Sequence, residues 1–438
     1  MFFCKGTNHY SNSFLELNFY FTFARLNTTL TMRNLTLLLL MLFAFSLNAQ
    51  VTIKQTKDDN DVKLSALPYY NFGKGIGLTS PDSLFQLNIR FRMQNRVTYI
   101  DNEGEKPAYD GQIRRLRLRF DGYVGNPKFL YAIQLSFAPG DVGEVIPGEN
   151  INIIRDAVVF YRPNRSWNIS FGQTKLPGNR QRVNSSGGLQ LTDRSINNAK
   201  FTIDRDFGFQ VHNLNEYMNK FSYNFKGAVS TGEGRNVTDK ADDGVAVTGK
   251  AEIFPFGAFQ KDGTYFEGDI MRESKPKLML SGAFQQNNHA RRTQGQLGVD
   301  LFEQRTMKSV LLDAMFKYNG WAAMTSYMSR TTNKNAVTFN PDDATDFNYA
   351  FVGEGFDYQL SYNFPSNYEV IGRFSTQKVG KDIELLAPNQ KQYSLGVTKY
   401  IWEHTFKIQT ELTFDTLDYY DGSTKNNWYL RFQVEIGI

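Results

Sequence analysis

Cysteine and histidine are scarce in this sequence of 438 residues, and each shortage excludes a class of chemistry. Cys4 is the only cysteine, and it lies ahead of a segment that we interpret as an export signal. The mature chain then has no thiol, which excludes disulfides, cysteine zinc sites and cysteine nucleophiles. Beyond that signal the only histidines are His212, His289 and His404, far apart in the sequence. Since no GxSxG, HExxH or P-loop motif occurs either, we expect no catalytic residues, no metal site and no cofactor.

Long hydrophobic runs are also scarce, and the mean hydropathy is negative, which excludes a polytopic helical membrane protein. The only long apolar run covers residues 35–47, follows Met32-Arg33 and ends just before Ala49. We interpret residues 32–49 as a secretory signal peptide cleaved after Ala49. A buried helix or an N-terminal anchor is the alternative. Because this signal has its own methionine, we interpret residues 1–31 as an upstream extension that arises from a misassigned start codon.

An excess of charge of one sign is lacking too. The chain has 49 basic and 44 acidic residues, a formal net charge of +5 that is spread evenly. This balance gives no electrostatic basis for a nucleic-acid partner. Aromatic residues, by contrast, make up 15% of the chain, which argues against disorder.

What the sequence does have, beyond residue 80, is alternation of apolar and polar residues. Near the C-terminus, Leu430, Phe432 and Val434 alternate with Arg431 and Gln433. Successive side chains of a strand point to opposite faces, so each such segment has one apolar and one polar face. Sixteen strands are predicted on this basis, at 84–97, 113–124, 129–137, 153–162, 167–174, 206–213, 220–230, 244–254, 277–286, 307–318, 321–330, 350–364, 368–376, 391–401, 404–415 and 427–438.

The connections between these segments alternate in length. Long connections, such as 98–112 and 175–205, take turns with tight ones, such as Asn319-Gly320. The exception is 255–276, which is long where a tight turn is expected. Alternating loop lengths are typical of an up-and-down barrel in an outer membrane, with long loops outside the cell and short turns in the periplasm. A secreted soluble sandwich or propeller is the alternative, but neither fold requires long and short loops to alternate.

The sequence therefore predicts an all-β fold: a transmembrane up-and-down antiparallel β-barrel of about sixteen strands over residues 83–438. Residues 50–82 would form a periplasmic N-terminal segment. The apolar faces must meet lipid, and the polar faces then line the interior. Sixteen strands enclose more space than side chains fill, so we expect a water-filled lumen. Candidate aromatic residues at the membrane interface are Trp167, Tyr400, Trp402, Trp428 and Tyr429.

The first hairpin is unusually basic on its inward face. Alternation places Arg90 and Arg92 of the first strand, and Arg115, Arg117 and Arg119 of the second, on one patch of lumen wall. Arginine keeps its charge and offers a planar set of donors that suits phosphate oxygens. The patch is either an anion path or a basic wall that faces an acidic loop, as in general porins.

The connection 175–205 is the longest in the predicted barrel and is also basic. If it folds into the lumen, it narrows the pore and makes it more positive; the alternative is a solvated extracellular flap. Its candidate anion-binding residues are Lys175, Arg180, Arg182 and Arg194, against only two acidic residues, Asp193 and Asp204.

The ordered series of these segments resembles the phosphate-selective porin O and P family of Gram-negative outer membranes. The resemblance is carried by FGKGIGLTSPDSLFQLNIRFRMQNR (72–96), RRLRLRFDGYV (114–124), residues 154–195 and RDFGFQVH (205–212). The resemblance implies a sixteen-stranded homotrimeric pore, a third loop (175–205) folded inward, and arginines that guide phosphate-like anions.

We therefore expect an outer-membrane porin of a bacterial cell that lets small hydrophilic solutes diffuse passively and prefers anions such as phosphate. Its partners would be outer-membrane lipid, small anions and two further copies of the chain, with no nucleic acid. The alternative is an outer-membrane barrel enzyme or adhesin with a blocked lumen. Lipid hydrolysis that depends on His212 or His404 would favour the enzyme.

Overall fold

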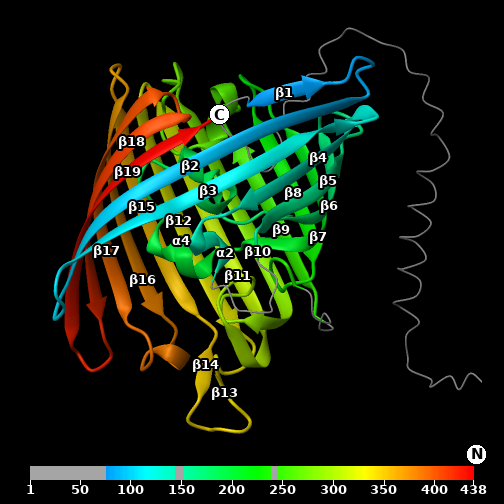
Figure 1. Ribbon diagram of the computed structural model, residues 1–438. Coiled ribbons are helices and arrows are strands. Elements are labelled where there is room, and N and C mark those ends of the chain that lie inside the picture. Colours follow the sequence, from blue (N-terminus) through cyan, green and yellow to red (C-terminus); the bar gives the residue numbers. More distant parts are fainter. Residues whose placement is uncertain (1–74, 144–151, 238–243) are drawn as a thin grey trace, which may run out of the picture. The chain divides into compact units, whose positions relative to one another are not determined.

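The computed structural model describes residues 75–143, 152–237 and 244–438 (Figure 1). The predicted extension at 1–31, the signal peptide at 32–49 and most of the segment 50–82 lie outside these residues and stay predictions. Within the described residues, none of the helices is long and apolar enough to cross a membrane.

Sixteen antiparallel strands of the described chain close into a barrel, as predicted. Each strand pairs with the next along the chain, and Asn427–Gly437 of the last strand pairs with Arg92–Asn102 of the first to complete the ring. The strands are β2 (Phe85–Asn102), β3 (Ala108–Val124), β4 (Asn126–Ser136), β5 (Ile154–Tyr161), β6 (Trp167–Lys175), β7 (Arg205–Asn215), β8 (Ser222–Ser230), β9 (Ala246–Phe254), β10 (Lys277–Arg292), β11 (Asp300–Tyr318), β12 (Trp321–Thr332), β15 (Gly353–Asn363), β16 (Tyr368–Val379), β17 (Asn389–Trp402), β18 (Phe406–Asp418) and β19 (Thr424–Gly437).

The remaining elements are short. A hairpin of β13 (Val337–Phe339) and β14 (Phe347–Tyr349) projects from the lower end of the barrel in Figure 1. The helices lie in the connections: α2 (Pro139–Val142), α3 (Arg180–Val183), α4 (Ile196–Phe201) and the 3₁₀ turns η3 (Ser186–Gly188), η4 (Gln260–Tyr265) and η5 (Lys381–Ile383).

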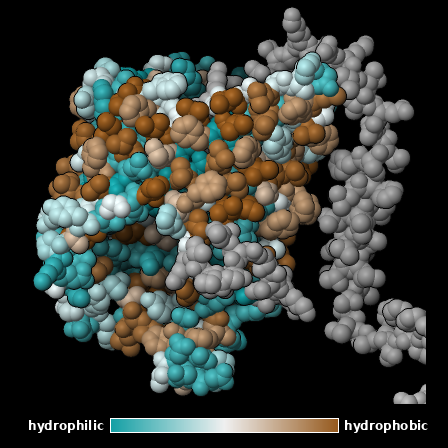
Figure 2. Space-filling view, in the orientation of Figure 1, coloured by the Kyte–Doolittle hydropathy of each residue, from teal (hydrophilic) through white to brown (hydrophobic). Residues whose placement is uncertain are grey.

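The barrel reverses the usual arrangement of a folded chain, because its apolar side chains point outward. In β19, Leu430 and Phe432 are 44% and 49% exposed, whereas Gln433 and Glu435, which follow them in the strand, are each 1% exposed. Figure 2 shows hydrophobic residues gathered in a broad band on the outer face of the strands. Only lipid makes such a surface favourable, and closure of the ring leaves no strand edge without a hydrogen-bond partner.

The first hairpin is longer than its sequence pattern predicts. β2 continues to Asn102 and β3 begins at Ala108, so the connection is 103–107 rather than 98–112. Tyr99 lies opposite Tyr109 in the added part of the ladder. The prediction relied on alternation, and alternation fades where a strand leaves the membrane and both faces meet water.

A short strand continues the wall beyond the C-terminus. β1 (Ile76–Thr79) pairs antiparallel with Gln86–Ile89 of β2. Ile438, directly after β19, donates its backbone N–H to Phe91 O at 3.1 Å. Since β3 occupies the other edge of β2, β1 extends the barrel along the edge that β19 leaves uncovered.

Two of the predicted interfacial aromatics are inside the barrel instead. Tyr400 is 1% exposed and its hydroxyl donates to Glu369 Oε2 at 2.5 Å. A bulge between Tyr400 and Trp402 puts them on opposite faces, and Trp402 is 63% exposed. Tyr429 also points inward, where its hydroxyl lies 3.3 Å from Glu411 Oε1. Trp428, its neighbour in the chain, cannot share this inward face, because adjacent strand residues alternate.

Candidate functional site

The connection between β6 and β7, residues 176–204, folds into the barrel; we call it loop 3. Its side chains reach the far wall. Thr192 Oγ1 donates to Glu411 Oε2 of β18 at 2.6 Å, and Ser195 Oγ donates to Asp357 Oδ2 of β15 at 2.7 Å. The predicted inward fold of this connection is confirmed.

Buried lysines of the barrel wall hold the backbone of loop 3. Lys407 Nζ donates to the carbonyl oxygens of Gly187 and Leu189 at 2.8 and 2.6 Å. Lys175 Nζ donates to two more carbonyls of the loop at 2.9 and 3.0 Å, and Lys250 Nζ donates to one at 2.7 Å. Backbone carbonyls that leave water need such donors, so these lysines allow a polar loop to fill the lumen.

The five arginines predicted on the first hairpin all face the interior. Arg90 lies opposite Arg119, and Arg92 lies opposite Arg117, in the register of β2 and β3. Arg115 donates from Nη1 to the side chain of Gln94 on β2 at 2.6 Å. Like charges directly opposite each other repel, so this wall needs negative partners in order to fold.

Three carboxylates supply part of that negative charge, the first of them on the hairpin itself. Asp121 of β3 is fully buried; its Oδ2 lies 3.0 Å from Arg90 Nη2, and its Oδ1 lies 2.9 Å from Arg119 Nε. Asp121 thereby offsets the two arginines that lie nearest the tight turn between β3 and β4.

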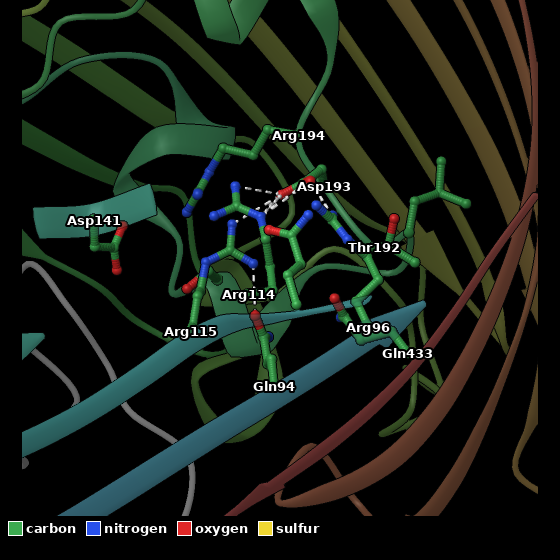
Figure 3. Close-up of polar contacts among 12 residues, drawn as sticks. Gln94, Arg96, Arg114, Arg115, Asp141, Thr192, Asp193, Arg194 and Gln433 are labelled. Carbon is green, nitrogen blue, oxygen red and sulfur yellow. Dashed lines mark hydrogen bonds and ion pairs between the residues drawn. The ribbon is translucent and has the colours of Figure 1, made fainter. Parts of the chain in front are cut away.

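The second carboxylate, Asp193 of loop 3, gathers several arginines around it. Figure 3 shows Arg96, Arg114 and Arg115 converging on this carboxylate. The Nη2 atoms of Arg114 and Arg115 lie 2.8 and 3.0 Å from Asp193 Oδ1, and Arg431 Nη1 lies 3.7 Å from Oδ2. Burial alone would raise the pKa of Asp193, but the surrounding guanidinium groups outweigh it and hold the pKa well below its ordinary value.

The third carboxylate, Asp141, comes from α2 in the connection between β4 and β5. Arg117 Nη2 lies 2.6 Å from Asp141 Oδ2, and Arg155 Nη1 lies 2.8 Å from Oδ1. Ser136 Oγ donates to the same carboxylate at 2.7 Å. Burial raises the pKa of Asp141, but Arg117 and Arg155 outweigh that effect and hold the pKa well below its ordinary value.

A cavity of about 550 Å³ lies between this wall and loop 3. Ten basic side chains line it, against three carboxylates: Asp141, Asp193 and Asp204. The residues predicted from the sequence that line it are Arg115, Arg117, Lys175, Arg182 and Arg194. Because the basic groups outnumber the carboxylates, the cavity has a strongly positive potential.

A second, smaller cavity of about 30 Å³ lies on the side of the tight turns and is bordered by Arg90, Arg92 and Arg119. Arg117 borders both cavities. At this junction, Arg92 Nη1 donates to Ser185 Oγ of loop 3 at 3.0 Å. The two cavities therefore share Arg117, beside a contact between loop 3 and the arginine wall.

The three predicted arginines of loop 3 differ from one another in their hydrogen-bond and ion-pair partners. Arg180 is fully buried, forms an ion pair with Glu252 of β9 and is not among the residues that line either cavity. Arg182 forms an ion pair with Asp204 within the loop. Arg194 donates from Nε to the backbone of Gln181 at 2.7 Å.

His212 and His404 lie in packed surroundings, whereas His289 is exposed. His212 is buried in β7, with its Nε2 3.2 Å from the side-chain oxygen of Gln210. The ring of His404 packs against Phe266 and Tyr400, at 4.8 and 5.2 Å between centroids. Across the described ranges, no group of three or more His, Cys, Asp and Glu residues could hold a metal ion.

A family model described as "Phosphate-selective porin O and P" matches residues 85–349, which is more than half of the chain. The chain belongs to the phosphate-selective porin O and P family. It is accordingly a porin of the bacterial outer membrane, which provides a passive channel. The basic cavities described above lie in its lumen.

Solved structures share the fold of this porin at low sequence identity. OmpF of Salmonella typhi is 13% identical over 82% of this chain and 100% of its own, with a TM-score of 0.52. The outer-membrane channel DcaP of Acinetobacter baumannii is 12% identical over 83% of this chain and 99% of its own, with a TM-score of 0.50. At this identity the likeness shows the fold alone. No significant match to a curated protein is found.

Half of the basic groups that line the porin's larger cavity were not among the site residues predicted from the sequence. They come from β3, β5, β7, the connection after β8, and β19: Arg114, Arg155, Arg205, Arg235 and Arg431. Alternation carries a signal for Arg431, which stands between the outward-facing Leu430 and Phe432. No local pattern reveals that these five strands and loops meet at one cavity, because closure of the barrel brings them together.

Proposed function

We propose that this porin carries small anions, phosphate among them, along a path between loop 3 and the wall of β2 to β6. The observation that carries the proposal is the charge of the larger cavity, where ten basic side chains face three carboxylates, an excess of seven. A pore lined by an excess of arginine and lysine lowers the energy of an anion and raises that of a cation. Guanidinium groups also match phosphate oxygens in geometry.

The two cavities suggest the course of the path. An anion in the larger cavity would pass Arg117 and Arg92 to reach the smaller one. At that point both arginines donate to the hydroxyl of Ser186, at 3.0 and 2.6 Å. An anion oxygen offers these donors a stronger, charge-assisted hydrogen bond, so it can replace the hydroxyl as it moves through.

The lipid of the outer membrane is the partner of the barrel's outer face, and we propose that the porin assembles as a homotrimer. The resemblance to its family supports this assembly. Chemical crosslinking of the porin in outer-membrane vesicles should give a ladder that ends at three copies. A porin that remains a single copy at every crosslinker concentration would contradict the trimer and leave the anion path untouched.

Ion selectivity in planar bilayers tests the anion path. Under a potassium chloride gradient, the purified porin should give a reversal potential on the chloride side, and added phosphate should reduce the chloride current. Replacing Arg115 and Arg117 together with serine should weaken both effects. Arg165→Ser is the matched control, because Arg165 lies at the exposed turn between β5 and β6 and lines neither cavity.

The outcomes separate the proposal from its alternative. A cation-side reversal potential would contradict the anion path, and a complete absence of conductance would favour a barrel with a blocked lumen. We propose that the porin has no enzymatic role, which its family and the channels that share its fold support. Lipid hydrolysis that is lost on replacing His212 or His404 would contradict that view.

A further inference from the structure

The connection between β9 and β10 is long although it lies at the end of the tight turns. It runs from Pro255 to Pro276, whereas β11 and β12 are joined at the same end by Asn319-Gly320 alone. We call residues 255–276 the inner segment. Phe266, Glu267 and the rest of its middle are as buried as loop 3, at 2% exposure for both of these residues. The inner segment therefore enters the lumen from the end opposite to loop 3.

One buried lysine of the wall fixes the inner segment. Lys317 Nζ of β11 donates to the carbonyl oxygens of Gly263, Phe266 and Gly268, each at 2.7 Å. The same ammonium group lies 4.4 Å from the centroid of the Phe266 ring. By binding three carbonyls, Lys317 fixes the path of the inner segment, as Lys407 does for loop 3.

The inner segment and loop 3 are joined through one carboxylate. Glu267 Oε2 accepts the backbone N–H of Gln190 at 3.0 Å, and Glu267 Oε1 accepts from Gln181 Nε2 at 3.0 Å. The backbone N–H of Glu267 donates to Gly188 O at 3.1 Å. Glu267 thus makes three hydrogen bonds to loop 3, at positions on both sides of η3.

The contact is also close in space. A Cβ atom built on Gly188 would lie 3.0 Å from Phe266 Cβ and 3.0 Å from Tyr265 O. Such distances are shorter than ordinary van der Waals contact, so the two backbones pack as closely as they do because position 188 has no side chain.

The wall behind loop 3 carries carboxylates where the opposite wall carries arginines. They lie on β9, β11, β15, β16 and β18, and each is at most 6% exposed. Each also accepts a hydrogen bond from loop 3: Glu252, Asp313, Asp357, Glu369 and Glu411. The same strands also carry Lys250, Lys317, Arg373 and Lys407. Loop 3 therefore covers a wall of mixed charge, whose five carboxylates would be open to cations if the wall faced the lumen water.

We infer that the inner segment holds loop 3 against this wall and its five carboxylates, so that permeating ions meet only the arginine side. The inner segment is then a determinant of ion selectivity, although it contributes no residue to either arginine-lined cavity. This inference rests on the anion preference proposed above. Its physical basis is that separating the two inserts gives water and cations access to five carboxylates.

Two variants test this role without touching the arginine wall. Gly188→Ala should push the inner segment away from loop 3 without a change of charge, and Lys317→Met removes the donor that fixes the inner segment. We expect both variants to show higher single-channel conductance and a reversal potential shifted toward the cation side. Gly249→Ala is the control for the glycine variant, because a Cβ atom there meets nothing within 4 Å.

The measurements distinguish failure of this inference from failure of the anion path. Heat-modifiable migration in detergent gels identifies the variants that fold as barrels. If Lys317→Met does not fold, Gly188→Ala alone provides the test. A wild-type porin with anion preference and a folded Gly188→Ala variant with unchanged conductance and reversal potential would overturn the inference alone. A wild-type porin without anion preference would overturn the proposed path, and this inference with it.

Discussion

Arg92 and Arg117 lie directly opposite each other across the β2–β3 ladder, and both donate to the hydroxyl of Ser186. The hydroxyl satisfies donors of both guanidinium groups without cancelling their charge. Asp141 lies 2.6 Å from Arg117, and Glu435 lies 3.7 Å from Arg92, so each arginine keeps a different ionic partner. The junction of the two cavities is therefore a place where an anion finds donors already oriented.

Arg117→Lys separates charge from geometry at this junction. Lysine keeps the positive charge, so anion preference in potassium chloride should change little. It lacks the planar set of donors, and a hydrogen bond to a charged group contributes about 1.5–3 kcal/mol, so the phosphate concentration that blocks chloride current should rise roughly tenfold or more. Titration of the chloride current with phosphate measures this. An unchanged phosphate block in Arg117→Lys would mean that charge alone matters.

Asp193→Asn removes the negative charge at the centre of the arginine cluster. The guanidinium groups of Arg96, Arg114 and Arg115 would then face the cavity without that counter-charge. We expect the reversal potential in a potassium chloride gradient to move further toward the chloride limit. Asp343→Asn, in the exposed hairpin outside the barrel, is the matched control. A shift toward cations in Asp193→Asn would contradict the assignment of this cavity to the ion path.

Acid should affect selectivity only well below the ordinary range of aspartate. The pKa of Asp193 is lower in the folded than in the unfolded chain, because Arg115, Arg114 and Arg96 from the wall and Arg431 from β19 surround it. Its ionised form therefore stabilises the fold above about pH 4, and this stabilisation is lost only as pH falls through the lower folded value. The reversal potential should stay constant from about pH 7 to about pH 4 and move toward greater anion preference in stronger acid. A transition centred near pH 4 would contradict the lowered pKa of Asp193.

The same experiment on Asp193→Asn provides the control for that titration. Asp141 has its pKa lowered in the same direction by Arg117 and Arg155, so some change in strong acid should remain. The difference between the two curves reports Asp193 itself. Identical curves would assign the whole acid response to other carboxylates.

The barrel is predictable from the sequence because lipid and lumen make opposite demands on neighbouring residues. Phe432 and Gln433 are adjacent, yet one is 49% and the other 1% exposed. The prediction is wrong where a strand extends beyond the lipid, or where a bulge shifts the alternation of faces. The β2–β3 hairpin extends to 103–107 beyond the lipid, and a bulge separates Tyr400 from Trp402.

The site was less accessible to sequence reasoning than the fold. The inward arginines of the first hairpin follow from alternation, but their partners do not. Asp193 lies 97 residues from Arg96 in the sequence, and Thr192 lies 219 residues from Glu411. The length of the inner segment is visible as an exception to the loop pattern, whereas its contact with Gly188 depends on how two inserts meet inside a closed ring. Pairings of this kind are set by tertiary structure, which no local pattern records.

Lys407→Met should loosen loop 3. Lys407 Nζ is the donor to the carbonyls of Gly187 and Leu189, and a buried carbonyl left without a donor costs about 1–3 kcal/mol. We expect noisier single-channel currents and a lower midpoint of thermal unfolding in detergent. Lys399→Met is the control, because Lys399 Nζ donates to Ser366 O at the exposed turn between β15 and β16. Quiet currents and an unchanged midpoint in Lys407→Met would show that the lysine is dispensable for holding the loop.

Phe432→Arg tests which face of the barrel meets lipid. Phe432 points outward from β19, and an arginine on the lipid face costs about 2–4 kcal/mol at the bilayer midplane. Arg431, its neighbour, points to the lumen, so the strand itself tolerates arginine on the other face. We expect Phe432→Arg to fold poorly into lipid vesicles, with a lower free energy of unfolding in urea, whereas Thr424→Arg at the exposed start of the same strand should behave as the wild type. Equal stability of the two variants would mean that the outer face is not in contact with lipid, and the porin assignment of that surface would fail.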